Sequence, residues 1–217
     1  MWRFFWSLMT SVSSPLLLTA FAGITACMGC TANLPNKFEH PPLLQRIDAR
    51  VGMSFRATAS DYVYVMDKPK FRFPIGQASV GRFRQVFQAM FAKTIELPES
   101  WRNAVADVDG VVELDGIMLQ ITRGVEGAWN DIVTVYYRVC LYQPDGFQIT
   151  CTSALGADTH IRHELDFSCF PLYVDRCLAP QTDAAMRHAI ARFISDFEAD
   201  PQVKAWAIRV ADGKRAN

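Results

Sequence analysis

Residues 133–151, VTVYYRVCLYQPDGFQITC, decide the fold that the sequence predicts for this chain. Apolar side chains alternate with other side chains through the first half of this stretch, which is the period of a half-buried β-strand. Pro144, Asp145 and Gly146 interrupt the alternation, and it resumes at Phe147. Proline sets φ at the first turn position, and glycine accepts a left-handed third position. The sequence therefore predicts two antiparallel strands joined by a three-residue hairpin.

The predicted register of this hairpin also decides which cysteines can meet. Gln143 should lie opposite Phe147, and counting outward from this pair places Cys140 and Cys151 on opposite faces of the sheet. Side chains on opposite faces cannot form a disulfide unless the register slips by one residue. We therefore predict no bond between Cys140 and Cys151.

Strand and helix periodicities surround the hairpin. Between residues 111 and 121 the apolar phase shifts by one at Asp115-Gly116, which predicts a β-bulge. An apolar stripe with steps of three and four residues predicts one amphipathic helix over 80–91, with Ser79 as its N-cap. A second such stripe follows Thr182, its predicted cap, and ends at Asp200-Pro201, before a short turn at 203–206 and a frayed tail after Asp212. Further strands are predicted over residues 51–57, 62–65, 71–73 and 95–97.

These elements predict an α+β fold, in which two amphipathic helices pack on a mixed, mainly antiparallel sheet. Residues 43–217 are long enough to form a single domain with one core. Without residues 1–26, the chain has 21 Lys and Arg against 22 Asp and Glu, a formal charge of about −1. This balance gives the domain no electrostatic reason to bind nucleic acid.

The first 26 residues have the pattern of an export signal. Arg3 is their one charged side chain, and an apolar run follows that ends in small residues. Ile24-Thr25-Ala26-Cys27 resembles the bacterial lipobox, which the lipoprotein signal peptidase cleaves before the cysteine. We predict a signal peptide over 1–26 and a diacylglycerol and N-acyl lipid on Cys27. Cys30 is the alternative lipidation site, and an ordinary signal peptide cut near Ala26 is the alternative to lipidation.

The segment after the predicted cleavage site is rich in Gly, Thr, Asn and Pro and has no periodicity, so residues 27–42 are predicted to be a tether. Fifteen extended residues at ~3.3 Å each would span roughly 50 Å. By family analogy, Met28 in place of aspartate after the lipidated cysteine favours the outer membrane, with the domain facing the periplasm.

Export also places the cysteines where disulfides persist. Cys169 and Cys177 enclose seven residues without clear periodicity, and we predict a disulfide between them that stabilises the domain by roughly 2–3 kcal/mol. Four buried thiols in the domain are the alternative.

Three motifs suggest chemistry, and each departs from its pattern. The stretch from Gly76 to Gly81 lacks the lysine of a phosphate-binding loop, since Arg82 follows the second glycine. Ser79 could be a serine-hydrolase nucleophile, but the elbow's first glycine is replaced by glutamine. His160, His163 and Glu164 form a short cluster whose spacing matches no established zinc motif. We therefore predict neither a catalytic residue nor a metal site.

Four aromatic side chains are the candidates for partner binding, because they fall in loops or on the polar face of strands and exposed aromatics are enriched at interfaces. Packing at the edge of the core is the alternative for each. These residues are Trp101, Trp129, Tyr136 and Tyr142.

The lipobox and the order strand, glycine turn, helix, strand over 71–97 resemble small envelope lipoproteins, such as the LPS-assembly lipoprotein LptE, YajG and the curli-secretion lipoprotein CsgG. This resemblance is architectural and transfers no residue role. It implies a non-enzymatic accessory or scaffold in envelope assembly, secretion or transport, which binds other envelope proteins through its sheet edge or its aromatics. We also expect that the chain can form a homo-oligomer. The alternative functions are a periplasmic serine hydrolase or metal-dependent enzyme, and a lipid- or glycan-binding protein.

Overall fold

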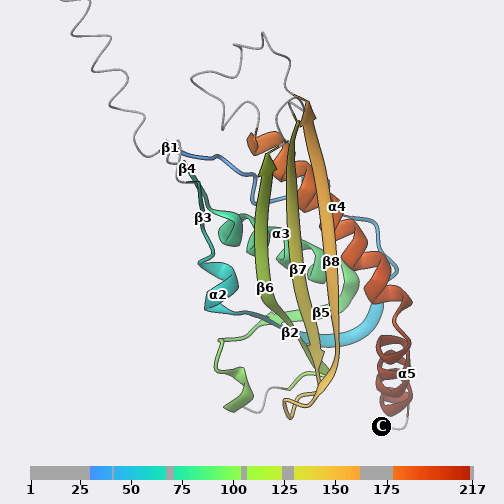
Figure 1. Ribbon diagram of the computed structural model, residues 1–217. Coiled ribbons are helices and arrows are strands. Elements are labelled where there is room, and N and C mark those ends of the chain that lie inside the picture. Colours follow the sequence, from blue (N-terminus) through green and yellow to red (C-terminus); the bar gives the residue numbers. More distant parts are fainter. Residues whose placement is uncertain are drawn as a thin grey trace, which may run out of the picture.

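The predicted hairpin lies in a five-stranded mixed sheet that is the centre of the computed structural model (Figure 1). The structure describes residues 30–40, 42–66, 71–103, 107–123, 130–161 and 178–215. The strands are β1 (Cys30–Thr31), β2 (Ile47–Phe55), β3 (Tyr64–Met66), β4 (Phe71–Phe73), β5 (Phe91–Glu96), β6 (Gly110–Arg123), β7 (Asn130–Tyr142) and β8 (Gln148–Ile161). The helices are α2 (Ala57–Ser60), α3 (Ile75–Met90), η1 (Trp101–Asn103), α4 (Ala179–Ala199) and α5 (Pro201–Arg215).

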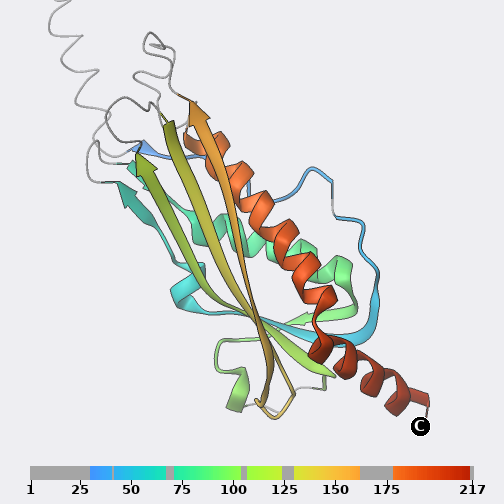
Figure 2. The ribbon, with the colours of Figure 1, turned by 45° about the vertical axis from the view of Figure 1, so that its right-hand side comes forward.

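The predicted α+β class is confirmed. The main sheet has the order β5-β2-β6-β7-β8, in which β2 is parallel to β5 and β6, while β6, β7 and β8 are antiparallel. A smaller sheet has the order β1-β4-β3. Helices α3 and α4 lie on the same side of the main sheet, and α5 extends beyond it (Figure 2). The core lies between these two helices and the sheet.

The hairpin itself forms as predicted. The Gln143 N–H donates to the Phe147 carbonyl at 2.8 Å, and Gly146 adopts a φ of 88°. The bulge predicted at Asp115-Gly116 is also confirmed, because the register of β6 against β7 shifts between Leu114 and Gly116.

The cysteine prediction is wrong, because a second bulge follows the hairpin turn. Tyr142 pairs with Gln148, but Leu141 pairs with Thr150, so Ile149 is an extra residue in β8. This one-residue slip brings Cys140 directly opposite Cys151, and the two form a disulfide with Cα atoms 4.0 Å apart. The predicted bond between Cys169 and Cys177 lies outside the described residues.

The first amphipathic helix begins earlier than predicted. Helix α3 starts at Ile75, after Pro74, so Ser79 lies inside the helix and is not its cap. The Ser79 hydroxyl is buried and bonds the Tyr137 hydroxyl of β7 at 2.9 Å. Phe83 of α3 packs against the Tyr137 ring, with ring centroids 5.0 Å apart. The predicted apolar stripe therefore does face the sheet.

The second amphipathic helix, α4, packs closely on β7 and β8. Its backbone approaches β8 at Gly156, where a Cβ atom would stand 2.9 Å from the Ala189 Cα and closer still to the Ala185 carbonyl oxygen. Thr182 is again inside the helix instead of capping it, since its hydroxyl donates to the Leu178 carbonyl at 2.7 Å. The small residues of α4 therefore let the helix lie against the sheet.

The chain continues into a full helix after α4, where only a short turn and a frayed tail were predicted. Asp200 leaves the helical conformation, with φ −62° and ψ 123°, and its Oδ1 accepts from the Gln202 and Val203 N–H groups at 2.6 and 3.3 Å. Pro201 then occupies the first position of α5, where its missing N–H costs nothing. The same two residues therefore end one helix and begin the next.

The prediction of a tether over residues 27–42 is also wrong in part, because residues 30–38 lie against the domain. β1 pairs in parallel with β4, and Ala32 and Leu34 are buried in the core. The Phe38 N–H donates to the Gln85 side chain of α3 at 2.7 Å. The segment is therefore docked, and only residues 28 and 29 separate the predicted lipidated cysteine, Cys27, from β1.

Candidate partner-binding face

Of the helices that the structure describes, α3 and α4 cover one face of the main sheet (Figure 2). On the other face of β6, β7 and β8, the segment around η1 covers one end (Figure 2). Beyond this end, the described side chains on the same face are exposed or partly exposed. We call these exposed positions the open face. They lie in three rows across the strands, Met118–Tyr136–Leu155, Gln120–Thr134–Ala157 and Thr122–Ile132–Thr159.

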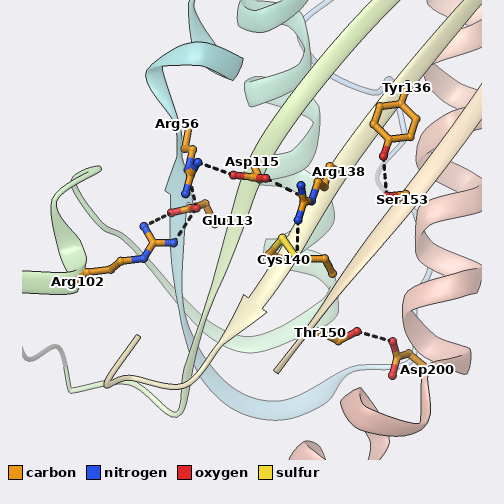
Figure 3. Close-up of a disulfide and its surroundings, with 11 residues drawn as sticks. Arg56, Arg102, Glu113, Asp115, Tyr136, Arg138, Cys140, Thr150, Ser153 and Asp200 are labelled. Atoms are coloured by element: carbon orange, nitrogen blue, oxygen red, sulfur yellow. Dashed lines mark hydrogen bonds and ion pairs between the residues drawn. A yellow bond between two sulfur atoms is a disulfide. The ribbon is translucent and has the colours of Figure 1, made fainter. Parts of the chain in front are cut away.

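The first of these rows is the most apolar. Met118 is 52% exposed and Leu155 is 58% exposed, although both are large apolar side chains. Tyr136 lies between them on β7, and its hydroxyl donates to the Ser153 Oγ at 2.7 Å, which fixes the ring (Figure 3). These three side chains form a continuous cross-strand row, which we call the apolar row.

A buried carboxylate organises the covered end of this face. Glu113 of β6 is fully buried, and its Oε1 accepts from Arg56 at 2.9 Å and from Arg102 at 3.0 Å (Figure 3). Its Oε2 accepts from the Trp101 ring N–H at 2.9 Å. The Arg102 guanidinium also lies over the Trp101 and Tyr142 rings, 4.6 and 4.7 Å from their centroids. Glu113 therefore holds η1 against the sheet.

The charge of Glu113 is stabilised by these contacts. Burial alone would raise the pKa of the carboxyl, but hydrogen bonds from Arg102 and Trp101 outweigh burial and lower the pKa below its ordinary value of about 4.5. The bond to Glu113 raises the pKa of Arg102 in turn. The pKa of Tyr142 is raised, first by burial and then by the Glu113 charge. The contacts of Glu113 and Arg102 therefore stabilise their charged forms and the packing of η1 on the sheet.

The arginines around this carboxylate face solvent. Arg56 also bonds Asp115 at 2.9 Å, and Asp115 contacts Arg138 of β7 at 3.4 Å (Figure 3). The side chains of Arg56, Arg102 and Arg138 are 40%, 35% and 48% exposed, whereas those of Glu113 and Asp115 are 0% and 13% exposed. Because the carboxylates are buried beneath the guanidinium groups, this arginine cluster presents positive charge to solvent.

The four aromatic candidates have different environments. The expected exposure of Trp101 and Tyr142 is wrong, because their exposed fractions are 1% and 6%, and both pack against the disulfide region instead. Tyr136 is partly exposed as expected, and Trp129 lies outside the described residues.

Sequence reasoning missed the exposed apolar residues Met118 and Leu155, and also Arg138. The signal for Met118 was present, because it is out of phase with the buried Leu119 and the partly buried Ile121 of the same strand.

Among the described residues, the structure does not place the catalytic and metal-binding candidates in a site. Ser79 is fully buried, and burial raises the pKa of its partner Tyr137. The side chain of His160, and both His163 and Glu164, lie outside the described residues. Among the described residues, no group of three His, Cys, Asp or Glu side chains is placed to hold a metal ion.

A groove of about 420 Å³ lies away from the open face, between the segment before β2 and helix α5. The groove is lined by Gln45, Arg46, Ile47, Asp48, Glu198, Val203, Lys204, Ala207, Ile208 and Ala211.

Among the helices that the structure describes, none is both long and apolar enough to cross a membrane.

No family model and no curated protein matches this sequence. Similar solved structures include a minor lipoprotein from Acinetobacter baumannii, with a TM-score of 0.41 and 6% identity over 71% of this chain and 95% of that chain. They also include a DUF330 protein from Xanthomonas campestris, with a TM-score of 0.37 and 8% identity over 87% and 98% of the two chains. A hypothetical protein from Chlamydia trachomatis has a TM-score of 0.38 and 10% identity over 68% and 98%.

At these TM-scores and identities, the likeness assigns neither a family nor a function to this chain. The three structures bear other names than LptE, YajG and CsgG, so the resemblance to those lipoproteins stays a prediction.

Proposed function

We propose that this protein is a lipid-anchored, non-enzymatic lipoprotein of the bacterial envelope, which binds another envelope protein through the open face of its sheet. The observation that carries the proposal is the apolar row, because Met118 and Leu155 are 52% and 58% exposed and lie on either side of Tyr136 in adjacent strands. Large apolar side chains that share one exposed patch are typical of interaction sites.

The sheet edge supports this role less well than the open face. Helix α4 runs along the edge strand β8, and its His188 Nδ1 lies 3.0 Å from the Ala157 carbonyl oxygen. A covered edge offers fewer backbone groups to an added strand. The anchoring half of the proposal depends on the lipobox, which ends at Cys27.

In-cell photocrosslinking tests the binding half of the proposal. A photoreactive phenylalanine analogue replaces Leu155 on the open face and, as a matched control, Ile208 on α5, which is 62% exposed. We expect a protein adduct at position 155 that is absent at position 208. Equal adducts at both positions, or no protein adduct at position 155, would overturn the proposed interaction.

Fractionation of the same cells tests the anchoring half. Intact-mass analysis should find acyl chains on mature protein that begins at Cys27, and a Cys27→Ala and Cys30→Ala double variant should leave the membrane fraction. Mature protein without acyl chains would exclude lipid anchoring, whatever position 155 binds.

A further inference from the structure

The open face has two zones of different chemistry that meet at Arg138. The three rows of the open face, which begin at the apolar row, contain no charged side chain. The row next to the apolar row is Gly116–Arg138–Ser153, and beyond it lie the other members of the arginine cluster. Successive rows are about 7 Å apart along a strand, so an uncharged surface directly adjoins a cationic one.

Arg138 is the residue at this boundary that can take an additional partner. Its Nε is 3.4 Å from an oxygen of Asp115, and one terminal nitrogen is 3.8 Å from the Cys151 sulfur. A guanidinium carries five N–H donors, so these two contacts leave donors for a second carboxylate. The side chain is 48% exposed, and an incoming group can therefore reach it.

The size of the uncharged zone favours a single segment of a partner over a second copy of this chain. Three strands about 4.8 Å apart and three rows about 7 Å apart cover roughly 300 Å², whereas a stable interface buries about 800 Å² on each partner. One α-helix, with a diameter of about 10–12 Å, matches the width of three strands. Helix α4 packs on the opposite face of β7 and β8 in the same manner.

We infer that the open face binds an acidic amphipathic helix of another envelope protein. Apolar residues of the helix pack on Met118, Tyr136 and Leu155, and a carboxylate of the helix about one row away binds Arg138. This inference depends on the proposed function and adds the chemistry of the partner to it. The positive charge of Arg138 favours a partner with aspartate or glutamate beside its apolar stripe, because Arg138 would repel a lysine at that position.

The test maps the adduct formed at position 155 and then exchanges charges. Mass spectrometry should locate the adduct in a helical segment of the partner that carries Asp or Glu beside its apolar stripe. Arg138→Glu should lower the adduct yield by about tenfold or more, and reversing the mapped acidic residue to Lys should restore it. Arg138→Gln is a second variant that removes the charge without adding repulsion, and melting temperatures check that both variants fold.

The outcomes separate this inference from the proposed function. A protein adduct whose yield does not change in Arg138→Glu, or that maps to a segment without a carboxylate, overturns the acidic helix and leaves the proposed function standing. Adducts only with lipid or with a second copy of this chain overturn both.

Discussion

At the scale of single residues, Glu113 is the side chain on which the covered end of the sheet depends. It accepts hydrogen bonds from Trp101 and Arg102 of η1 and from Arg56, which is 57 residues away in the sequence. A hydrogen bond to a charged group contributes about 1.5–3 kcal/mol, and a buried group left without its partner costs a similar amount. The cluster therefore holds η1 to the sheet through a single carboxylate.

Glu113→Gln should lower the free energy of unfolding by about 1–3 kcal/mol near neutral pH, because it removes the charge that the two arginines face. Glu99→Gln, at an exposed position just before η1, is the matched control and should change little. Urea denaturation of both variants measures the difference. Equal stability of the two variants would show that Glu113 contributes nothing measurable.

The lowered pKa of Glu113 also predicts how the stability of the fold depends on pH. The folded pKa of Glu113 lies below its ordinary value of about 4.5, so its contribution is fully present above that pH and is lost as the pH falls through the folded pKa. The melting temperature of the wild-type protein should therefore decrease more steeply below about pH 4.5 than that of Glu113→Gln. Parallel curves for the two proteins would contradict the lowered pKa.

At the scale of elements, the contact between α4 and β8 depends on the lack of a side chain at Gly156. Gly156→Ala should destabilise the fold by about 1–3 kcal/mol or more, because its Cβ would overlap the α4 backbone, which cannot move aside as a side chain could. Gly116→Ala is the control within the same sheet, since the nearest atom to its Cβ would be 3.8 Å away. In thermal denaturation, Gly116→Ala should have a higher melting temperature than Gly156→Ala. The reverse order would refute the close approach of α4 to β8 at Gly156.

The disulfide joins β7 to β8 and gives a second prediction at this scale. Peptide mapping without reduction should recover Cys140 linked to Cys151, and their double replacement by alanine should cost about 2–3 kcal/mol. If the double variant still loses stability in reductant, and peptide mapping recovers Cys169 linked to Cys177, the bond predicted between these two cysteines also forms. Recovery of Cys140 and Cys151 as free thiols would contradict the structure.

The elements show what the sequence could and could not predict. The bulge at Gly116 was predictable, because a glycine and a shift in apolar phase coincide there. The bulge at Ile149 has no such signal, since an isoleucine suits a regular strand, and so the pairing of Cys140 with Cys151 was missed. Helix α5 was also missed, because Asp200-Pro201 signals the end of one helix as strongly as the start of another.

The candidate site was predictable only in part, for a related physical reason. Tyr136 could be placed on the polar face of its strand from alternation alone, and it is partly exposed there. Trp101 could not be placed, because its burial comes from the contact with Glu113, which lies on another element. The arginine cluster likewise brings together residues from the N-cap of α2, from η1 and from β7 around two carboxylates of β6, and it has no local motif.

At the scale of the whole molecule, the docked segment 30–38 sets the geometry of the proposed anchor. Even fully extended, three residues such as 27–29 reach at most about 10 Å, in place of the roughly 50 Å expected from a free tether. The end of the domain that carries β1, β3 and β4 should therefore lie next to the membrane, while α5 projects from the opposite end (Figure 1).

Spin labels on the lipidated protein measure this orientation. Val65 of β3 is 50% exposed and lies two strands from Thr31, whereas Ile208 is exposed on α5. A nitroxide at position 65 should be relaxed by a nickel chelate attached to lipid headgroups, and a nitroxide at position 208 should not. Equal relaxation at both positions would mean that residues 30–38 detach from the domain on the membrane.

The docking of β1 also determines how a mechanical load would travel through an acylated protein. A pull on the acylated sulfur would pass along β1 into its parallel neighbour β4, and from there into α3, instead of first straightening a loose chain. Parallel strands that are pulled along their axes share the force among their backbone hydrogen bonds. A protein bound to the domain would thus be held at a fixed distance from the lipid surface and in a fixed orientation.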